Sequence, residues 1–339
     1  MINRSDGAMV YRIARYYYVE NLSQNEIAQI ERISRSKVSR LLEKARSSGM
    51  VNVEIKMPAT PLASMLEKRL QEELKLERVI VAPASVSESS DETEETLIQD
   101  VASIAAIHFP ELLKDCKIIG LGWGRTVYSV PTYMSFQAPS SSRIFVPMVS
   151  NCSLRNRFLQ NSTIVSRYGE RFGAETYYLN ISGMLFPGES RPRSDLYNIE
   201  QLEEYWRRMD AAVFGLGNPP ARNDHYLKKE LSMADFSSRD MDPDARGEML
   251  SQTYLSDGTA FPLGGGEKDR NVIAFPLDLL KDVPRTILLA ATEEKAEPIF
   301  YAAKNGYLKT LITDHLAAQK ILTIAEEKKK EKAEPQQNE

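Results

Sequence analysis

The sequence predicts an α/β protein in two parts: a small N-terminal helical module and a larger domain with a Rossmann-like, mainly parallel sheet. Three observations predict this class. Apolar residues recur at helical spacing in the first fifty positions, and short apolar runs alternate with amphipathic segments after about residue 58. Charge is also divided unevenly, because residues 1–57 hold ten Lys or Arg against six Asp or Glu in a chain of net charge −4.

Composition excludes several classes of protein. Hydrophobic residues make up 42% and charged residues 27%, which is ordinary for a soluble globular chain. The N-terminus lacks the apolar run of a signal peptide, and no window approaches the roughly 18 apolar residues of a membrane span. We therefore expect a cytoplasmic protein with no membrane partner.

Metal and redox chemistry are not indicated either. The two cysteines, Cys116 and Cys152, lie far apart, and the three histidines, His108, His225 and His315, are isolated. We expect no metal site, no disulfide framework, no cofactor and no catalytic residue.

The first helix of the N-terminal module is predicted from Val10, Ile13, Ala14 and Tyr17, which recur at i, i+3, i+4 and i+7. The second begins at Ser23, where SQNE places a glutamate three residues later. That spacing is typical of a capping box, which satisfies two backbone donors at a helix start.

The third helix opens near Ser34 and places Val38, Leu41, Leu42 and Ala45 on one face. A connection of only three or four residues joins it to the second helix, as in a helix-turn-helix motif. In that motif the start of the second helix of the pair enters the major groove of DNA. The predicted DNA-binding residues on the other face are Ser34, Arg35, Ser36, Lys37, Ser39 and Arg40.

Two other interpretations of this basic face stay open. It could be a solvated helix surface, as most charge runs are, or a winged helix used for protein contacts. The run MVNVEIK after Gly49 alternates like a strand and is predicted to form the wing.

The larger domain is predicted from apolar runs that alternate with helical stretches. Continuous β-branched runs of this kind indicate a parallel sheet covered on both faces, which binds ligands at the carboxyl ends of its strands. The predicted strands include 79–83, 118–123, 143–149, 176–182, 211–217, 272–276, 286–292 and 308–314. Amphipathic stretches lie at 91–109, 162–172, 200–209, 225–236 and 294–305.

The strand IIGLGW ends in a glycine-rich turn, IIGLGWGRT, which contains Gly122, Gly124, Arg125 and Thr126. Glycines let the backbone approach a ligand, and the free N–H groups of a helix start attract phosphate. The turn could equally be a tight connection without a ligand. Pro131 should shorten or kink the helix that follows.

Three further places follow predicted strands. AAVFGLGNPP ends in Gly215, Gly217 and Asn218; RGEMLSQTYLSDG holds Glu248 and Asp257; and Lys295 lies at the start of a helix that ends at Gly306. Each also has an ordinary interpretation as a turn, a cap or a surface charge.

Taken together, these blocks resemble the SorC family of bacterial transcriptional regulators of sugar catabolism. SRSKVSRLLEKARSSGMVNVEI is similar to its helix-turn-helix. GLGWGRT, FGLGNP, GEMLSQTYLSDG and LLAATEEKAEPIFYAAKNGYLKTLITD are similar to successive blocks of its effector domain, in the same order. The resemblance extends from about residue 8 to 325.

This resemblance implies a function and a partner set. The family binds operator DNA, usually as tetramers, and its C-terminal domain is similar to sugar-phosphate isomerases of the NagB/RpiA type but serves as a sensor. The effector is a phosphorylated sugar or a related metabolite. The implied effector-binding residues are Gly122, Gly124, Arg125, Thr126, Glu248, Asp257 and Lys295.

The corresponding domains are 1–57 for DNA binding, 58–325 for effector binding and oligomerisation, and a disordered charged tail at 326–339. The expected function is therefore a regulator, a repressor, of a carbohydrate-utilisation operon. The alternatives are a sugar-phosphate isomerase or deaminase with an appended DNA-binding domain, which would share the fold, and a scaffold protein.

Two departures from the family pattern concern the pocket. Ala291 and Thr292 stand where paired glycines are common before the lysine, and SNCSLRNRF follows the strand RIFVPMV where glycines are common. The ligand is therefore expected to be atypical, with Ser150, Asn151, Ser153 and Arg155 as additional candidate contacts.

Overall fold

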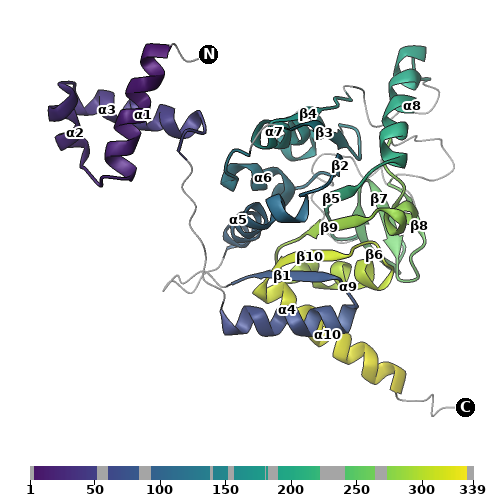
Figure 1. Ribbon diagram of the computed structural model, residues 1–339. Coiled ribbons are helices and arrows are strands. Elements are labelled where there is room, and N and C mark those ends of the chain that lie inside the picture. Colours follow the sequence, from purple (N-terminus) through teal and green to yellow (C-terminus); the bar gives the residue numbers. More distant parts are fainter. Residues whose placement is uncertain are drawn as a thin grey trace, which may run out of the picture. The chain divides into compact units, whose positions relative to one another are not determined.

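The chain forms two compact units, Met1–Lys56 and Met57–Glu339, in the computed structural model (Figure 1). The sequence placed this boundary one residue later. The structure describes residues 4–51, 60–83, 93–137, 140–151, 156–179, 181, 190–221, 241–263 and 273–333. Each unit is described by itself.

The first unit is a three-helix module consisting of α1 (Arg4–Tyr18), α2 (Gln24–Glu31) and α3 (Arg35–Ser47). The three helices are those that the sequence predicts. Their apolar faces meet in one core, whose buried members are Val10, Ile13, Ala14, Ile27, Val38, Leu41, Leu42 and Ala45. Tyr17 was expected in this core, but its side chain is exposed and its ring packs edge-on against Tyr18.

The capping box at the start of α2 is confirmed. The Ser23 N–H donates to the Glu26 carboxylate at 2.8 Å, and the Ser23 hydroxyl accepts from the Glu26 N–H at 3.3 Å. Only residues 32–34 separate α2 from α3, and Arg32 adopts a left-handed conformation (φ 51°) that ends α2 abruptly. The predicted wing falls mostly on residues 52–59, outside the described residues.

The second unit is built on a seven-stranded sheet in which all described neighbours run parallel, as predicted. The strand order is β1-β10-β9-β5-β2-β3-β4. The strands are β1 (Arg78–Ala82), β2 (Ile118–Leu121), β3 (Ser140–Pro147), β4 (Ala174–Thr176), β5 (Ala211–Gly215), β9 (Arg285–Leu289) and β10 (Thr310–Asp314). After β2 the chain builds outward to β4, and after β5 it builds toward the opposite edge, so β2 and β5 flank the point where the order reverses.

Helices cover both faces of this sheet, because successive strand residues point to opposite sides (Figure 1). In β5, for example, Ala212 and Phe214 enter one core, whereas Ala211 and Val213 enter the other. The first core is shared with α4 (Pro61–Leu74), α8 (Arg193–Arg207), α9 (Ala296–Lys304) and α10 (His315–Ala333). The second is shared with α5 (Glu94–Leu112), α6 (Arg125–Tyr133) and α7 (Asn161–Phe172).

A second, antiparallel sheet was not predicted. It consists of β6 (Ala245–Met249), β7 (Gln252–Leu255) and β8 (Ala260–Pro262). The β6–β7 connection is a two-residue turn in which Leu250 and Ser251 both have positive φ, at 50° and 59°. Such hairpin turns usually carry Asn or Gly, so Leu250 and Ser251 are not an ordinary signal for one.

Several predicted elements differ from the observed ones. The run 176–182 was expected to be a strand, yet β4 ends at Thr176. In the run 272–276, which was also expected to be a strand, the described residues 273–276 contribute only an isolated bridge, between Ala274 and Val149. The amphipathic stretch 225–236 lies outside the described residues. α6 spans only nine residues with Pro131 near its end, which confirms the expected shortening.

The predicted disordered tail is wrong for its first half. α10 continues to Ala333, so residues 326–333 are helical, and residues 334–339 lie outside the described part. This extension is held against α4 by two ion pairs, Arg69–Glu326 at 2.9 Å and Lys329–Glu73 at 2.5 Å. The charged residues whose abundance indicated disorder therefore form ion pairs between α4 and α10.

The ion pair between α1 and α2 makes the first unit sensitive to acid. Arg12 donates two hydrogen bonds to the Glu31 carboxylate, at 3.0 and 2.9 Å, which holds the pKa of Glu31 below its ordinary value of 4.5. Because the unfolded chain has the higher pKa, the pair stabilises the unit above that value. The stabilisation is lost as pH falls through the lower, folded-state pKa.

We therefore expect Glu31→Gln to speed amide hydrogen exchange in α1 and α2 at pH 7, and to lose this effect at a pH below the folded-state pKa of Glu31. Hydrogen-exchange mass spectrometry at both pH values measures this. Glu20→Gln is the control, because Glu20 pairs with Arg15 between two exposed side chains and should change little. Equal effects of the two substitutions would contradict the assignment.

Candidate functional site

A small pocket lies at the carboxyl ends of β2, β5 and β9, next to the point where the strand order reverses. Its volume is about 60 Å³. The residues that line it are Glu94, Ile98, Trp123, Gly124, Arg125, Thr126, Gly215, Leu216, Gly217, Glu248, Leu289, Ala290, Ala291 and Lys295. Parallel sheets bind ligands in this position, because the turns after the strands leave a crevice there.

Five of the seven predicted effector residues come together in this pocket: Gly124, Arg125, Thr126, Glu248 and Lys295. They come from three separate parts of the chain. Their convergence makes the pocket the candidate effector site, and their contacts with an effector stay a prediction.

The turn from β2 to α6 forms one wall. Gly124 precedes α6 with φ 133°, a conformation that residues with a side chain rarely adopt. Gly215 faces this turn, and a Cβ atom on it would lie 3.1 Å from the Trp123 carbonyl oxygen. The two glycines therefore allow the end of β5 to approach the start of α6, whose N–H groups border the pocket.

Gly122 does not line the pocket, contrary to its predicted role. A Cβ atom there would lie 2.7 Å from the Leu250 side chain and 2.8 Å from that of Phe214. Gly122 is thus a packing position, which lets Leu250 in the β6–β7 turn settle on the end of β2.

Glu248 is buried beneath that same hairpin, with 2% of its surface exposed. Its carboxylate accepts a hydrogen bond from the Ser251 N–H at 2.8 Å, which helps to hold the left-handed turn. Its backbone pairs with Gly217 after β5 through bonds of 2.8 and 3.0 Å. One side chain therefore borders the pocket and also fixes the turn of the hairpin.

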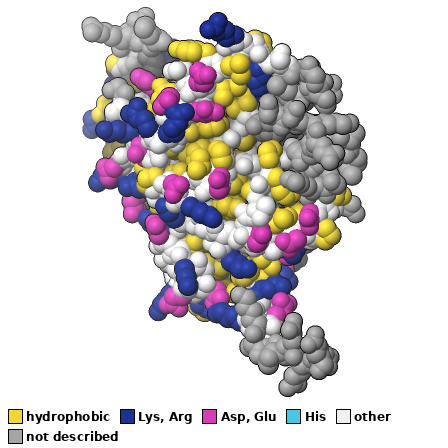
Figure 2. Space-filling view, turned by 90° about the vertical axis from the view of Figure 1, so that its right-hand side faces the viewer, with side chains coloured by type: hydrophobic (Ala, Val, Ile, Leu, Met, Phe, Trp, Pro, Cys, Tyr) yellow, Lys and Arg dark blue, Asp and Glu magenta, His cyan; other side chains and the backbone are white. Residues whose placement is uncertain are grey.

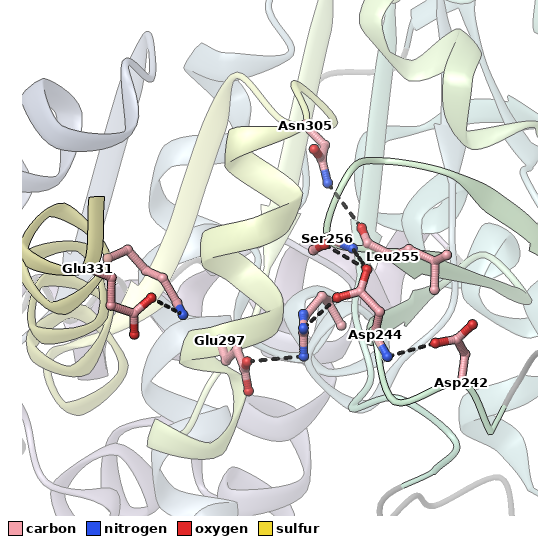
Figure 3. Close-up of polar contacts among 9 residues, drawn as sticks. Asp242, Asp244, Leu255, Ser256, Glu297, Asn305 and Glu331 are labelled. Carbon is pink, nitrogen blue, oxygen red and sulfur yellow. Dashed lines mark hydrogen bonds and ion pairs between the residues drawn. The ribbon is translucent and has the colours of Figure 1, made fainter. Parts of the chain in front are cut away.

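The β6 strand that carries Glu248 is tied to α9, which follows Lys295 (Figure 3). Arg246 pairs with Asp244 at 2.5 Å and with Glu297 of α9 at 3.7 Å, and its guanidinium stacks over the Tyr301 ring. Asp244 also accepts from the Ser256 hydroxyl at 2.6 Å, and this bond lowers the pKa of its carboxyl. These contacts set the spacing between Glu248 and Lys295.

Lys295 lies in a short 3-10 turn, Glu293–Lys295, between β9 and α9. This turn starts at Thr292, whose N–H donates to the buried Asp314 carboxylate at 2.6 Å. The other Asp314 oxygen accepts from the Leu316 and Ala317 N–H groups, both at 2.9 Å, and so caps α10. Asp314 thereby anchors the segment that presents Lys295.

Asp257 lies outside the pocket, also contrary to prediction. Its carboxylate accepts from the Thr259 N–H at 2.7 Å within the β7–β8 turn, which lowers its pKa. The following Gly258 has φ 89°, as such turns require. The ordinary turn interpretation holds for this residue.

Of the candidate polar residues after β3, the described ones, Ser150 and Asn151, do not line the pocket. Asn151 exchanges two hydrogen bonds with Ser162, each at 3.1 Å, and Ser150 is buried. Ser153 and Arg155 lie outside the described residues. Asn161, which the sequence reading missed, donates to the carbonyl oxygens of Leu121 (2.7 Å) and Val149 (2.9 Å) and so joins the ends of β2 and β3.

Glu94 is the pocket residue that the sequence reading overlooked. It begins α5 and forms an ion pair with Arg125, and both side chains line the pocket. A signal existed, because TEETLIQDV has the form of a capped helix start. A helix that follows β1 starts at the same edge of the sheet as α6.

The described residues contain no group of three or more His, Cys, Asp or Glu side chains that could hold a metal ion. Among them, His108 stands half-buried beside Arg78, where burial lowers its pKa, and it does not border the pocket. Cys116 is a buried free thiol. No helix in the described part of the chain is long and apolar enough to cross a membrane.

The second candidate site is the basic face of α3 in the first unit. Ser34 caps this helix, accepting from the Lys37 N–H at 3.3 Å. All six predicted DNA-binding residues, Ser34, Arg35, Ser36, Lys37, Ser39 and Arg40, are exposed, whereas Val38, Leu41, Leu42 and Ala45 are buried. Within the described residues, Arg35, Lys37 and Arg40 form no ion pair, so their charges face solvent.

The residue that follows the pocket residue Ala291 is strained. Thr292 has φ 88° and ψ 145°, a region that is almost confined to glycine. Its hydroxyl is also buried without a hydrogen-bond partner. We expect Thr292→Gly to raise the free energy of unfolding by about 1 kcal/mol, because relief of strain exceeds the entropy cost of glycine.

Ala291→Gly is the matched control, because Ala291 is not among the described residues with positive φ. It should lower the free energy of unfolding by about 0.5–1 kcal/mol. Urea unfolding followed by tryptophan fluorescence reports on this unit, which holds both Trp123 and Trp206. Equal destabilisation by the two glycines would refute the strain at Thr292.

Comparison with known proteins places this architecture in a family. Residues 62–323, more than half of the chain, match the sequence model of the family described as "Putative sugar-binding domain". The sorbitol operon regulator of Klebsiella pneumoniae is 26% identical, with 95% of this chain and 100% of that protein aligned. The deoxyribonucleoside regulator of Bacillus subtilis is 23% identical over 95% of this chain and 99% of its own.

A solved structure agrees in fold over both units. The full-length sorbitol operon regulator SorC from Klebsiella pneumoniae superposes with a TM-score of 0.63 and 24% identity, covering 94% of this chain and 99% of that one. These relatives are transcriptional regulators and not enzymes, and the pocket residues described above lie within the matched domain. The chain therefore belongs to this sugar-binding domain family and is a SorC-family transcriptional regulator.

Proposed function

We propose that this regulator is a cytoplasmic repressor of a carbohydrate-utilisation operon, whose operator affinity is modulated by a phosphorylated sugar or related metabolite. DNA binding is assigned to residues 1–57, and effector binding and oligomerisation to residues 58–325. The names of its relatives, which include a sorbitol operon regulator and a deoxyribonucleoside regulator, support a carbohydrate-related role.

The observation that carries the effector proposal is the composition of the pocket at the switch point. It combines the N–H groups of α6, the Arg125 guanidinium, the Lys295 ammonium and the Glu248 carboxylate. The first three suit a phosphate group, because donors at a helix start and cations both favour anions. A buried carboxylate accepts hydrogen bonds from hydroxyls, which suits the sugar part of such a ligand.

The exposed face of α3 supports the operator proposal. Arg35, Lys37 and Arg40 lie in its first turns with their charges free of described ion pairs, and Ser36 and Ser39 stand between them. Arginine and lysine can reach guanine edges or phosphates, and serine can donate to phosphate oxygens.

The proposed regulation follows from linkage between the two sites. An effector that binds one arrangement of the assembled protein more tightly shifts the population toward it. If that arrangement separates the two reading helices by a distance other than one turn of DNA or a multiple of it, operator affinity falls.

We also propose that the protein forms a homo-tetramer. Figure 2 shows the side of the molecule that lies on the right in Figure 1, where apolar side chains form a band through the charged surface. α8 is on that side and exposes Leu196 and Tyr197, at 48% and 61%. An apolar groove of about 420 Å³ lies between Trp206 of α8 and the segment that contains Phe275 and Leu279. Exposed apolar surfaces of this kind mark protein contacts.

Sedimentation equilibrium at micromolar concentration should give the mass of four chains. A monomer mass, with or without operator DNA, would remove the oligomeric part of the proposal and with it the linkage described above.

Operator binding is tested by fluorescence anisotropy with DNA from upstream of the protein's own operon, at two salt concentrations. We expect tight, salt-sensitive binding that one member of a panel of sugars and sugar phosphates alters. Affinity equal to that for random DNA, with every metabolite, would contradict the proposed function.

Within that assay, Arg40→Ala should weaken operator binding by about 1–3 kcal/mol and reduce discrimination against random DNA. Arg46→Ala is the control, because this substitution also removes one positive charge, but from the last turn of the same helix. Unchanged affinity and salt slope in the Arg40 variant would remove it from the recognition surface.

A further inference from the structure

The pocket is small, and two of its own side chains form an ion pair at its wall. Its volume of about 60 Å³ is far below the 300–1,000 Å³ of typical ligand sites. Glu94 and Arg125 both line it, and their ion pair connects the first residue of α5 to the first residue of α6. A ligand that reaches Arg125 therefore meets the Glu94 carboxylate there.

Glu94 is not needed to start its helix. The Thr93 hydroxyl already accepts from the Thr96 N–H at 3.2 Å, and it exchanges a further bond with the Thr96 hydroxyl at 2.8 Å. The Glu94 carboxylate is instead turned toward Arg125. Both side chains remain substantially exposed, at 54% and 38%, so the pair can be exchanged for another partner at small cost.

A carboxylate and a phosphate compete for the same guanidinium donors, because both use its planar fork of N–H groups. The Glu94 charge also repels any second anion that approaches Arg125. A neutral sugar would gain nothing from displacing Glu94, whereas an anionic group would take over its hydrogen bonds.

We infer that Glu94 is a specificity-determining residue of the effector pocket: its carboxylate occupies Arg125 in the free protein, and the anionic group of the effector replaces it there. This inference rests on the proposed function, since it takes the pocket as the effector site. Binding of an anion at Arg125 then breaks the ion pair between α5 and α6. Only a ligand whose anionic group binds Arg125 more strongly than the Glu94 carboxylate does so.

The test uses the full chain and inorganic phosphate as probe, at constant ionic strength. Phosphate affinity is obtained from the rise of the unfolding temperature with phosphate concentration. We expect Glu94→Gln to bind phosphate about fivefold more tightly than the wild type, the effect of removing one exposed ion pair and its charge.

Glu95→Gln is the matched control. Glu95 also lies in the first turn of α5 and carries the same charge, but it bonds to Gln99 and not to Arg125. Its phosphate affinity should match that of the wild type, whereas the double variant Glu94→Gln/Arg125→Ala should lose the gain.

Three results would overturn the inference: equal gains in the two glutamine variants, a gain that persists without Arg125, or no phosphate binding by any variant. Failure of the proposed function is seen separately. If phosphate affinity behaves as expected but the wild-type operator titration responds to no sugar phosphate, the anion site stands and the regulatory role falls.

Discussion

The parallel course of the seven-stranded sheet is the constraint on which the effector unit depends. Because these strands end at one edge, the turns after β2, β5 and β9 meet there, and the reversal between β2 and β5 leaves a crevice. Arg125, Glu248 and Lys295 are far apart in sequence and meet only because the sheet aligns their elements. Close backbone approach at Gly215 and the Asp314 anchor then fix where each side chain lies.

Much of this arrangement could be predicted from the sequence, because apolar runs indicate the strands of the parallel sheet and helical spacing indicates the three-helix module. Five of the seven effector-binding residues predicted from motifs lie together in one pocket, and their contact with an effector stays a prediction. Motifs do not separate packing from binding. Gly122 is required for the close packing of Leu250, and Asp257 accepts a hydrogen bond within its own turn. The motifs alone did not show either role. The β6–β7 hairpin was not predicted, because Leu250 and Ser251 adopt positive φ values that their residue types disfavour. Glu94 was not predicted as a pocket residue, because its partner Arg125 is 31 positions away in the sequence.

The two candidate anion sites use charge in opposite ways. On α3, Arg35, Lys37 and Arg40 face solvent and form no ion pair within the described residues, so they act at long range on any polyanion. In the pocket the Arg125 cation is already held by a carboxylate, so only a ligand that outcompetes it gains entry. The first arrangement suits a search along DNA, whereas the second suits discrimination among small metabolites.

The first and last parts of the effector unit lie side by side. β1 pairs in register with β10, and α4 is held against α10 by Arg69–Glu326 and Lys329–Glu73. The earliest strand of this unit to leave the ribosome thus gains its only described sheet neighbour from the last strand to be synthesised. The nascent unit therefore cannot complete its sheet until β10 has been synthesised. The N-terminal module does not depend on later parts of the chain in this way, because its buried core residues all precede position 46. It can therefore fold while the rest of the chain is still being synthesised.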